Sequence, residues 1–492
     1  MARHKTAITR YQLSAPMQHL GYAGLLEGRT VFDYGCGHGH DVEVLRATGL
    51  EAKGWDPYYL PSTPIEPADI VNLGYVLNVI EDPSERVDVA RRAFDLAHVC
   101  VAIAVMIVGK YDTRNMHPHG DGFLTARGTF QKYFGQAEIK NLLEETLQCE
   151  AIAVSPGIFF VFRDKIEEQR FLAERARRVR DISTLLRRRD GPQRKSVTQE
   201  RIDANRETLG ALWQRTLELG RRPHESELDE NLQMAIRAGL GTLGKALSLA
   251  RRLFDPAEQD AARAARVDDL RLYFALNLFN QRRRYRALPP ELQRDVKVFF
   301  GSHKAAQAAG RELLFSLGDP AVVREACAVA AHSGLGHLHG DHSLQLPVAL
   351  VDRLPATLRA YVGCAERLYG SISNADLIKI HIQSGKLTLL RYDDFDVNPL
   401  PRLEERIKID MRAQDIVFYD HRDRPQLLYL KSRYLAPDNS LYGRQNAFDD
   451  VLLSLGLFDL SGFGPEPHNF YAMLAHVGYR IEGFEIVSLK HR

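Results

Sequence analysis

Cysteine is scarce in this sequence, and the spacings that hold structural zinc are missing. The five cysteines stand at positions 36, 100, 149, 327 and 364, in or beside apolar stretches, and none forms a CxxC pair. Neither a disulfide framework nor a zinc site of that kind is expected. The pattern is typical of a protein from a reducing compartment.

Long hydrophobic runs are absent too. The first twelve residues, MARHKTAITRYQ, have no apolar core, and no eighteen consecutive apolar residues occur in the 492-residue chain. A secretory leader and a membrane-spanning helix are therefore not expected. We expect a cytoplasmic protein that does not contact a membrane.

Net charge of one sign is also nearly lacking, because the formal charge is only +2. The positive charge is nevertheless concentrated: residues 170–195 hold ten basic and three acidic side chains, and RRRYR follows at 282–286. Such runs can follow nucleic-acid phosphates, although most charged helical faces are only solvated. Two interpretations of these arginine-rich segments remain open: they contact DNA, or they are only solvated.

The chain is longer than one hydrophobic core usually serves, so two to four domains are expected. Strands alternate with helices at first, which predicts an α/β domain with a mostly parallel, Rossmann-like sheet over residues 1–165. Long polar helices then predict an all-helical basic domain over residues 166–330. Short apolar runs with Gly and Pro return and predict a smaller α+β domain over residues 331–492.

Three alternating glycines follow an acidic residue in the stretch VFDYGCGHGHDV at 31–42. A strand that turns sharply into a helix needs glycine, because the backbone takes positive φ angles there and a ligand must come close. The order Asp-x-Gly-x-Gly-x-Gly differs from the dinucleotide pattern GxGxxG and is typical of S-adenosylmethionine-dependent methyltransferases. We expect the cofactor's methionine part to lie on this loop, with contacts from Asp33, Tyr34, Gly35, Cys36, Gly37 and Gly39.

A second acid, Asp56, closes the next expected strand about twenty residues after the loop. A carboxylate at this place can accept hydrogen bonds from both hydroxyls of a ribose, with Pro57 beside it. Asp69 follows Asp56 by only thirteen positions. Because a full helix and a third strand do not fit between them, the part of the sheet that often contacts adenine is expected to be shortened.

The stretch after Asp69 reads as the strand whose end faces the reacting group. DNA amino-methyltransferases place an Asn or Asp, two prolines and an aromatic residue there, which grip an exocyclic amine. Here the four residues are Asn72, Leu73, Gly74 and Tyr75, without the prolines. Asn72 and Tyr75 are therefore candidate catalytic residues, and Asn72 and Leu73 candidate cofactor contacts; the alternative is a cofactor wall with Tyr75 packed. No cysteine has the Pro-Cys context that a cytosine-C5 mechanism needs.

Hydrophobic periodicity predicts the remaining elements. The first domain continues with a helix at 84–97, a buried strand at 99–108, helices at 128–134 and 137–147, and closing strands at 149–154 and 158–163. Helices are expected at 198–220, 226–254, 257–284, 289–300 and 303–317. Strands are expected at 377–382, 386–392, 407–411, 416–419 and 427–430.

Two other patterns suggest metal chemistry and are interpreted as turns. HLHGDH at 337–342 spells the HxHxDH motif of metallo-β-lactamase-like hydrolases, but neither the preceding strand nor the following glycine pair is present. Asp393, Asp394 and Asp396 could join Lys431 in a nuclease-like site, but Tyr429 stands where that site needs an acid. No metal site is assigned.

The chain also resembles a known family over nearly its whole length. The matching segments, in order, are KTAITRYQLSAP, VFDYGCGHGHDV, KGWDPYY, ADIVNLGYVLNVIEDPSER, RGTFQKYF, SPGIFFVF, DDLRLYFALNLF, RDVKVFFGSHKAA, LRAYVGCAERLYG, LIKIHIQSGKLTLLRYDDFD and IKIDMRAQDIVFYD. They closely resemble the methyltransferases associated with DNA phosphorothioation systems. The resemblance implies a bacterial protein from a neighbourhood of DNA-modification or restriction genes, with an N-terminal S-adenosylmethionine domain and other modification-system proteins as partners.

Three functions remain open from the sequence. The leading hypothesis is an S-adenosylmethionine-dependent methyltransferase that acts within a DNA-modification system. The second is a non-catalytic accessory or nucleic-acid-binding protein that keeps the cofactor pocket. The third is a metal-dependent hydrolase centred on residues 337–342.

Overall fold

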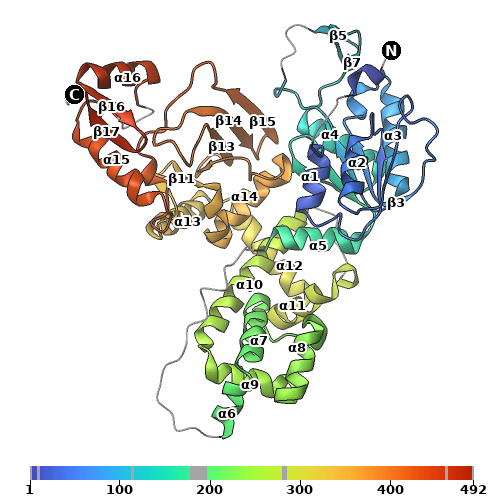
Figure 1. Cartoon of the computed structure of the whole chain (residues 1–492), viewed down its shortest axis with the longest axis vertical. Helices are drawn as coiled ribbons and strands as arrows, with labels where there is room; N and C mark the ends of the chain where they lie inside the picture. The colour runs from blue at the N-terminus through green and yellow to red at the C-terminus, as the bar shows by residue number, and fades with distance from the viewer. Residues whose placement is uncertain are drawn as a thin grey trace. The chain divides into compact units, whose positions relative to one another are not determined.

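The computed structural model describes residues 3–7, 12–111, 116–177, 197–279, 285–459 and 464–489. Contacts divide the chain into two compact units, one of Met1–Glu168 with Leu317–Arg492 and one of Gln169–Ser316. Figure 1 shows the elements of each unit by chain position. The finer division into three domains, with limits at 165 and 330, stays a prediction.

The N-terminal part of the first unit contains a six-stranded, mostly parallel sheet. Its strand order is β2-β1-β3-β4-β9-β8, in which β9 and β8 run antiparallel to the rest. This confirms the expected Rossmann-like α/β class and the closing strand pair. The strands are β1 (Val31–Tyr34), β2 (Ala52–Trp55), β3 (Ala68–Gly74), β4 (Ala97–Ala104), β8 (Ala151–Ser155) and β9 (Ile158–Phe162).

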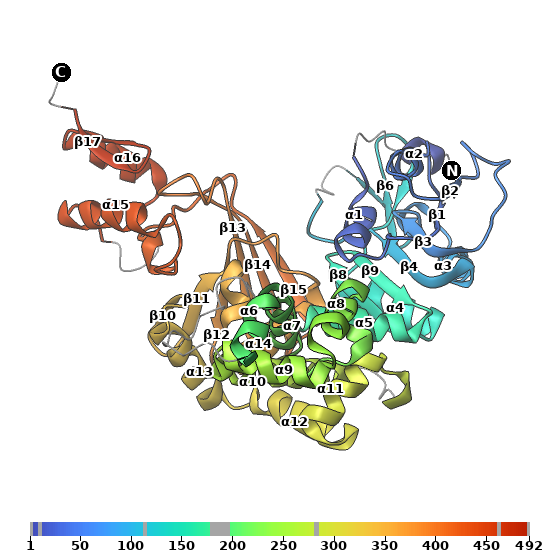
Figure 2. The same ribbon diagram turned by 60° about the horizontal axis from the view of Figure 1, so that its bottom comes forward.

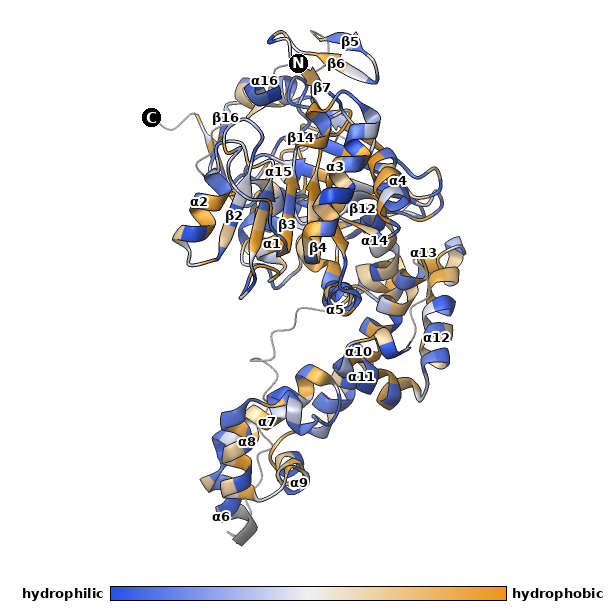
Figure 3. Ribbon diagram, turned by 90° about the vertical axis from the view of Figure 1, so that its right-hand side faces the viewer, coloured by the Kyte–Doolittle hydropathy of each residue, from blue (hydrophilic) through white to orange (hydrophobic). Residues whose placement is uncertain are grey.

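The central strands β3 and β4 are apolar, as their colour in Figure 3 shows. Their burial is complete at Val71 and Val101, which explains why the sequence of these strands does not alternate. Asp82 begins α3 by accepting a hydrogen bond from the Ser84 amide at 2.8 Å. The helices are α1 (Ala15–Tyr22), α2 (His40–Ala47), α3 (Pro83–Leu96) and α4 (Gln136–Leu147).

The described residues between Asp56 and Asp69 contain neither a full helix nor an additional strand of this sheet, as the sequence predicts. β2 is the edge strand, and the chain returns to β3 through a turn that contains only an isolated bridge between Asp56 and Leu60. The edge of the sheet beside Asp56 is therefore formed by this turn.

The helix expected at 128–134 is wrong. This segment contains β7 (Phe130–Gln131), which joins β5 (His117–His119) and β6 (Gly122–Leu124) in a small antiparallel sheet. Phe130 pairs with Leu124 and is buried, so a tertiary contact overrides the local helical pattern.

Helices alone form the second unit in its described residues, which confirms the all-helical middle region. Trp213 is fully buried and stacks on Phe254 at 5.6 Å. The expected run 226–254 is broken, because a π-turn at Ile236–Leu240 precedes a new helix capped by Thr242. The α-helices described between residues 165 and 316 are α5 (Lys165–Arg175), α6 (Val197–Ala204), α7 (Arg206–Leu219), α8 (Glu230–Ala235), α9 (Leu243–Leu253), α10 (Pro256–Leu276), α11 (Pro290–Phe300) and α12 (His303–Ser316). Most of the arginine-rich segments 170–195 and 282–286 lies outside the described residues.

The C-terminal part of the first unit has a second six-stranded sheet, entirely antiparallel and in sequence order. One face packs on α13 (Pro320–His332) and α14 (Ala356–Tyr369), with Ile380, Leu389 and Ile407 in the shared core (Figure 2). The strands are β10 (His337–His339), β11 (Ser343–Pro347), β12 (Leu377–His381), β13 (Lys386–Tyr392), β14 (Leu403–Asp410) and β15 (Asp415–Asp420).

The last strand expected there, at 427–430, is wrong. Leu427 forms only an isolated bridge with Arg402, and Leu430 has a left-handed φ of 52°. The Lys431 ammonium that follows is buried and donates to the carbonyls of Phe395 and Asn398. The chain ends in α15 (Tyr442–Ser454), α16 (Pro467–His476) and the hairpin of β16 (Tyr479–Glu482) and β17 (Glu485–Ser488). No helix in the described ranges has the length and apolar composition that a membrane crossing needs.

Candidate functional site

The glycine loop joins the end of β1 to the start of α2. Gly35, Gly37 and Gly39 have φ angles of 87°, 55° and 83°, a conformation that side chains disfavour. A Cβ atom at Gly35 would lie 2.5 Å from Cγ2 of Val76. The loop therefore packs against the segment after β3 more closely than any side chain at position 35 allows.

Asp56 connects this loop to the end of β2. Its Oδ2 accepts a hydrogen bond from the Gly37 amide at 3.1 Å, and its Oδ1 accepts from the amides of Tyr58 and Tyr59 at 2.9 Å each. A carboxylate offers about four lone-pair positions. One position on Oδ2 is thus left for a ligand hydroxyl.

The loop is also fixed to β2 through its backbone, because the amides of Gly35 and Cys36 both donate to the Trp55 carbonyl, at 2.7 and 3.1 Å. Burial, followed by the charges of Asp33 and Asp56, raises the pKa of the Cys36 thiol to about 12. The thiol is therefore protonated at neutral pH and is not a nucleophile.

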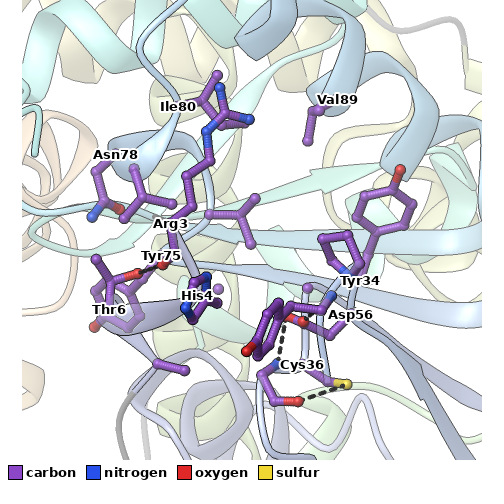
Figure 4. Close-up of a pocket in the computed structure, with 18 of the residues that line it drawn as sticks. Arg3, His4, Thr6, Tyr34, Cys36, Asp56, Tyr75, Asn78, Ile80 and Val89 are labelled. Carbon is purple, nitrogen blue, oxygen red and sulfur yellow. Dashed lines mark hydrogen bonds between the residues drawn. The ribbon is translucent and has the colours of Figure 1, made fainter. Parts of the chain in front are cut away.

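One cavity of about 1180 Å³ opens above the carboxyl ends of β1, β2 and β3 (Figure 4). Ligands bind at this edge of parallel sheets because the loops that follow the strands meet there. Several predicted contacts line the cavity together: Tyr34, Gly35, Cys36, Gly37, Asp56, Pro57 and Tyr75.

The other predicted residues lie behind this wall. Asn72 donates to Asp33 Oδ1 at 2.8 Å, and the two residues are only 2% and 4% exposed. They are paired across β1 and β3, so their contact joins neighbouring strands. Leu73 is buried in the core and Gly39 begins α2. None of these four residues lines the cavity, and their assigned roles stay predictions.

Two residues after β3 line another part of the cavity wall. Tyr75 has a left-handed φ of 61°, and its amide donates to the Ala104 carbonyl at 2.7 Å. A non-glycine residue in this conformation costs on the order of 1–3 kcal/mol and often marks a functional position. Asn78, which sequence reasoning missed, is 1% exposed and lines the cavity, and its Oδ1 has no hydrogen-bond partner among the described residues. A ligand N–H or O–H group would supply the missing donor.

The N-terminal strap, residues 3–7, contacts two sides of the cavity (Figure 4). The Arg3 guanidinium donates to the carboxylates of Glu81 and Glu85 at 2.6–2.9 Å. On the other side His4 stacks on Tyr58 with ring centroids 3.9 Å apart, and the Tyr59 hydroxyl donates to the His4 carbonyl at 2.9 Å. No local pattern predicts this strap, because its partners lie more than fifty positions away along the chain.

Carboxylates outnumber cations in the cavity wall. Asp56, Asp82, Glu85 and Asp88 line it, against the guanidinium groups of Arg3 and Arg92. The Glu85 hydrogen bond, followed by that of Glu81, raises the pKa of Arg3 against the effect of its burial. The cavity therefore suits a ligand that carries positive charge.

The histidine motif at 337–342 does not assemble a metal site. Across the part of the chain that the structure describes, no group of three or more His, Cys, Asp and Glu side chains could hold a metal ion. His337 and His339 contact each other at 4.7 Å, whereas the Asp341 side chain is 80% exposed.

Comparison with known proteins gives matches only at the level of solved structures. No family model matches the chain, and no curated protein does. A sugar N-methyltransferase from Streptoalloteichus is 14% identical, with a TM-score of 0.24, over 32% of this chain and 96% of that chain. The 1,6-didemethyltoxoflavin-N1-methyltransferase of Burkholderia thailandensis is 12% identical, with a TM-score of 0.22, over 32% and 93%. A SAM-dependent methyltransferase from Aquifex aeolicus is 17% identical, with a TM-score of 0.21, over 30% and 89%. Identities and TM-scores this low support no conclusion on the activity of this chain. The fold is assigned from the strand order of the sheet.

Proposed function

We propose that the N-terminal α/β region binds S-adenosylmethionine and transfers its methyl group to an acceptor. The observation that supports this most is the junction of the glycine loop with Asp56, where the Gly37 amide and the acid at the tip of β2 meet in one cavity. A side-chain-free turn beside a carboxylate is what an adenosyl ligand with a ribose diol requires.

The residues present fit the parts of this cofactor. Gly35 lets the loop pack on Val76 where a Cβ would clash, which holds the turn in the cavity wall, and Asp56 keeps one acceptor position for a ribose hydroxyl. The acidic wall with Asp82 and Glu85 suits a sulfonium cation. When bound, the cofactor supplies an electrophilic methyl group.

The chain's own residues would then hold the acceptor in line with that group. Asn78 Oδ1 accepts a hydrogen bond from the acceptor's N–H or O–H, and Tyr75 forms the adjoining wall. Positioning of this kind supplies most of the rate enhancement of a direct displacement. A cavity of about 1180 Å³ exceeds the ~300–1,000 Å³ of a single ligand site, so it has room for donor and acceptor together.

We further propose DNA as the acceptor and a DNA-modification system as the setting. This finer proposal rests on the sequence resemblance alone. The arginine-rich segments 170–195 and 282–286 would supply phosphate contacts, and their effect would weaken with salt.

A methyl-transfer assay with labelled cofactor tests both levels of the proposal. The acceptors are phosphorothioated DNA, unmodified DNA, RNA, protein and a small-amine panel. Label in DNA supports the full proposal, and label in another class supports only the general one. Tight cofactor binding without label in any acceptor would favour the accessory function, and absence of binding would contradict both.

A further inference from the structure

One face of the C-terminal sheet, opposite α13 and α14, carries several cations. Apolar residues alternate toward α13 and α14, so the residues between them point to the opposite face. Strand pairing aligns Gln345, Lys379, Thr388 and Lys408 in one row across β11 to β14. We define the basic face as His337, His339, Lys379, His381, Arg406 and Lys408.

The cations of this face are close enough to repel one another. Burial, followed by the charges of Lys408 and Arg406, lowers the pKa of Lys379. Burial, followed by the charges of Lys379, Lys408 and Lys386, lowers the pKa of His381 to about 4. Lys379, Arg406 and Lys408 therefore share one half-buried surface.

Among the described residues, neither Lys379 nor Lys408 has an acidic partner, and the Arg406 guanidinium lies over the Tyr419 ring at 4.7 Å instead. Acids on β14 are already paired, Asp410 with Lys386 at 2.9 Å and Glu404 with Arg391 at 3.0 Å. The centre of the face therefore lacks a counter-charge.

Unpaired polar atoms gather on the same face. Within the described ranges, the buried atoms His339 Nε2, Ser343 Oγ and Arg406 Nε have no hydrogen-bond partner, and Ser343 is only 1% exposed. Ser343 pairs in register with His339 on one side and with His381 on the other. Since buried polar groups are normally satisfied, three such atoms from three strands indicate a missing partner.

We propose that the basic face binds a phosphate group, seated over Thr388 between Lys379 and Lys408. The two lysines stand on strands two positions apart, about 10 Å between backbones, so their long side chains can converge on one tetrahedral anion. The Thr388 hydroxyl, bonded to His381 Nε2 at 2.9 Å, forms the floor. His337 and His339 form the adjoining wall with Tyr434, whose ring lies 6.0 and 6.1 Å from theirs.

This chemistry is shared by free phosphate and by the backbone phosphates of nucleic acid, and a titration separates the two sources. The full chain is titrated calorimetrically with inorganic phosphate, with a single-stranded DNA of about 12 nucleotides and with the matching duplex. Binding of phosphate alone identifies a free anion as the ligand. Binding of a strand or duplex with a steep loss in salt identifies a nucleic-acid backbone.

The double substitution Lys379→Gln with Lys408→Gln should weaken binding about tenfold or more, because two charge-assisted contacts are lost. Lys386→Gln is the matched control, since it removes the same charge from the same sheet where Asp410 already neutralises it. If the double variant does not fold, Lys408→Gln alone is used. Absence of binding to all three probes, or equal binding by the lysine variants and wild type, would overturn the proposal.

Discussion

The Asp56 carboxylate accepts a hydrogen bond from the Gly37 amide at 3.1 Å, so the tip of β2 and the glycine loop share one contact. The same carboxylate holds the turn after β2 through the amides of Tyr58 and Tyr59. One side chain therefore fixes the loop, shapes the shortened sheet edge and keeps an acceptor for a ligand. This junction is the basis of the predictions that concern the cofactor.

Replacing Asp56 by Asn tests the role of its charge. The Asn oxygen can still accept from Tyr58 and Tyr59, but the second oxygen becomes an amide that donates. We expect S-adenosylmethionine affinity to fall about 10- to 100-fold, because hydrogen bonds to charged groups contribute ~1.5–3 kcal/mol. Equilibrium binding measures this, and an unchanged melting temperature shows that the fold is kept. Equal affinity in the variant would exclude Asp56 from the site.

Gly35→Ala tests the close approach of the loop. The new Cβ meets Val76 at 2.5 Å, and we expect cofactor binding to be lost. Gly49→Ala is the matched control, because its φ of 86° nearly equals the 87° of Gly35 but its Cβ meets nothing within 4 Å. Both variants carry backbone strain on the order of 1–3 kcal/mol, so only the difference in binding reports on the cavity. Equal binding by both would contradict the site.

Arg3→Ala tests the N-terminal strap. The variant loses both carboxylate partners, Glu81 and Glu85, and we expect cofactor affinity to fall about three- to tenfold, since partly exposed ion pairs contribute up to ~1 kcal/mol each. The Lys5→Ala control changes an exposed side chain on the same strap and should bind normally. Fluorescence competition measures both affinities. If the strap does not influence the site, the cofactor affinity of Arg3→Ala will equal that of wild type.

Asn78→Ala separates acceptor positioning from cofactor binding. Since Asn78 Oδ1 has no partner in the described part of the chain, its removal should leave the melting temperature unchanged or higher. We expect unchanged cofactor affinity and a methyl-transfer rate lowered about 100-fold, measured with the acceptor that the labelling assay identifies. A parallel loss of cofactor affinity would move Asn78 from the acceptor side to the cofactor side.

The free energy of unfolding should fall as the pH is lowered, because two histidines of the basic face are neutral in the folded protein. Burial first, and neighbouring cations second, hold the pKa values of His339 and His381 at about 4, below the ordinary 6.5. The unfolded chain thus binds more protons between pH 6.5 and 4, so this stability is complete above pH 6.5 and is lost toward pH 4. Because the rings are partly exposed, we expect about 1 kcal/mol for each. Melting curves of wild type and His339→Asn at both pH values check this; an equal acid effect in the variant contradicts it.

More of the residues predicted around the glycine loop and β2 line the cavity than of those predicted at the exit from β3. Asp33, the glycines and Asp56 belong to one strand–turn–helix–strand unit, in which spacing along the chain determines spacing in the fold. The exit from β3 is different, because the chain must bend before a side chain can reach the cavity. Asn72 still lies within β3 and faces Asp33, whereas Asn78, after the bend at Tyr75, lines the cavity.

Contacts between distant segments explain what the sequence could not predict. Arg3 meets Glu81 and Glu85 across about eighty positions, and no local pattern encodes that pairing. The basic face is formed by single residues from several strands, each ordinary in its own segment. The helix expected at 128–134 failed for the same reason, since Phe130 pairs with Leu124 in a sheet.

The most direct test of the central claim is a calorimetric titration of the full chain with S-adenosylmethionine, with free methionine and adenosine as partial ligands. We expect one site, micromolar affinity and much weaker binding of either part alone, because the glycine loop would hold the methionine part and Asp56 the ribose of one molecule. A chain that shows no heat and no rise in melting temperature at millimolar cofactor would contradict the proposed function.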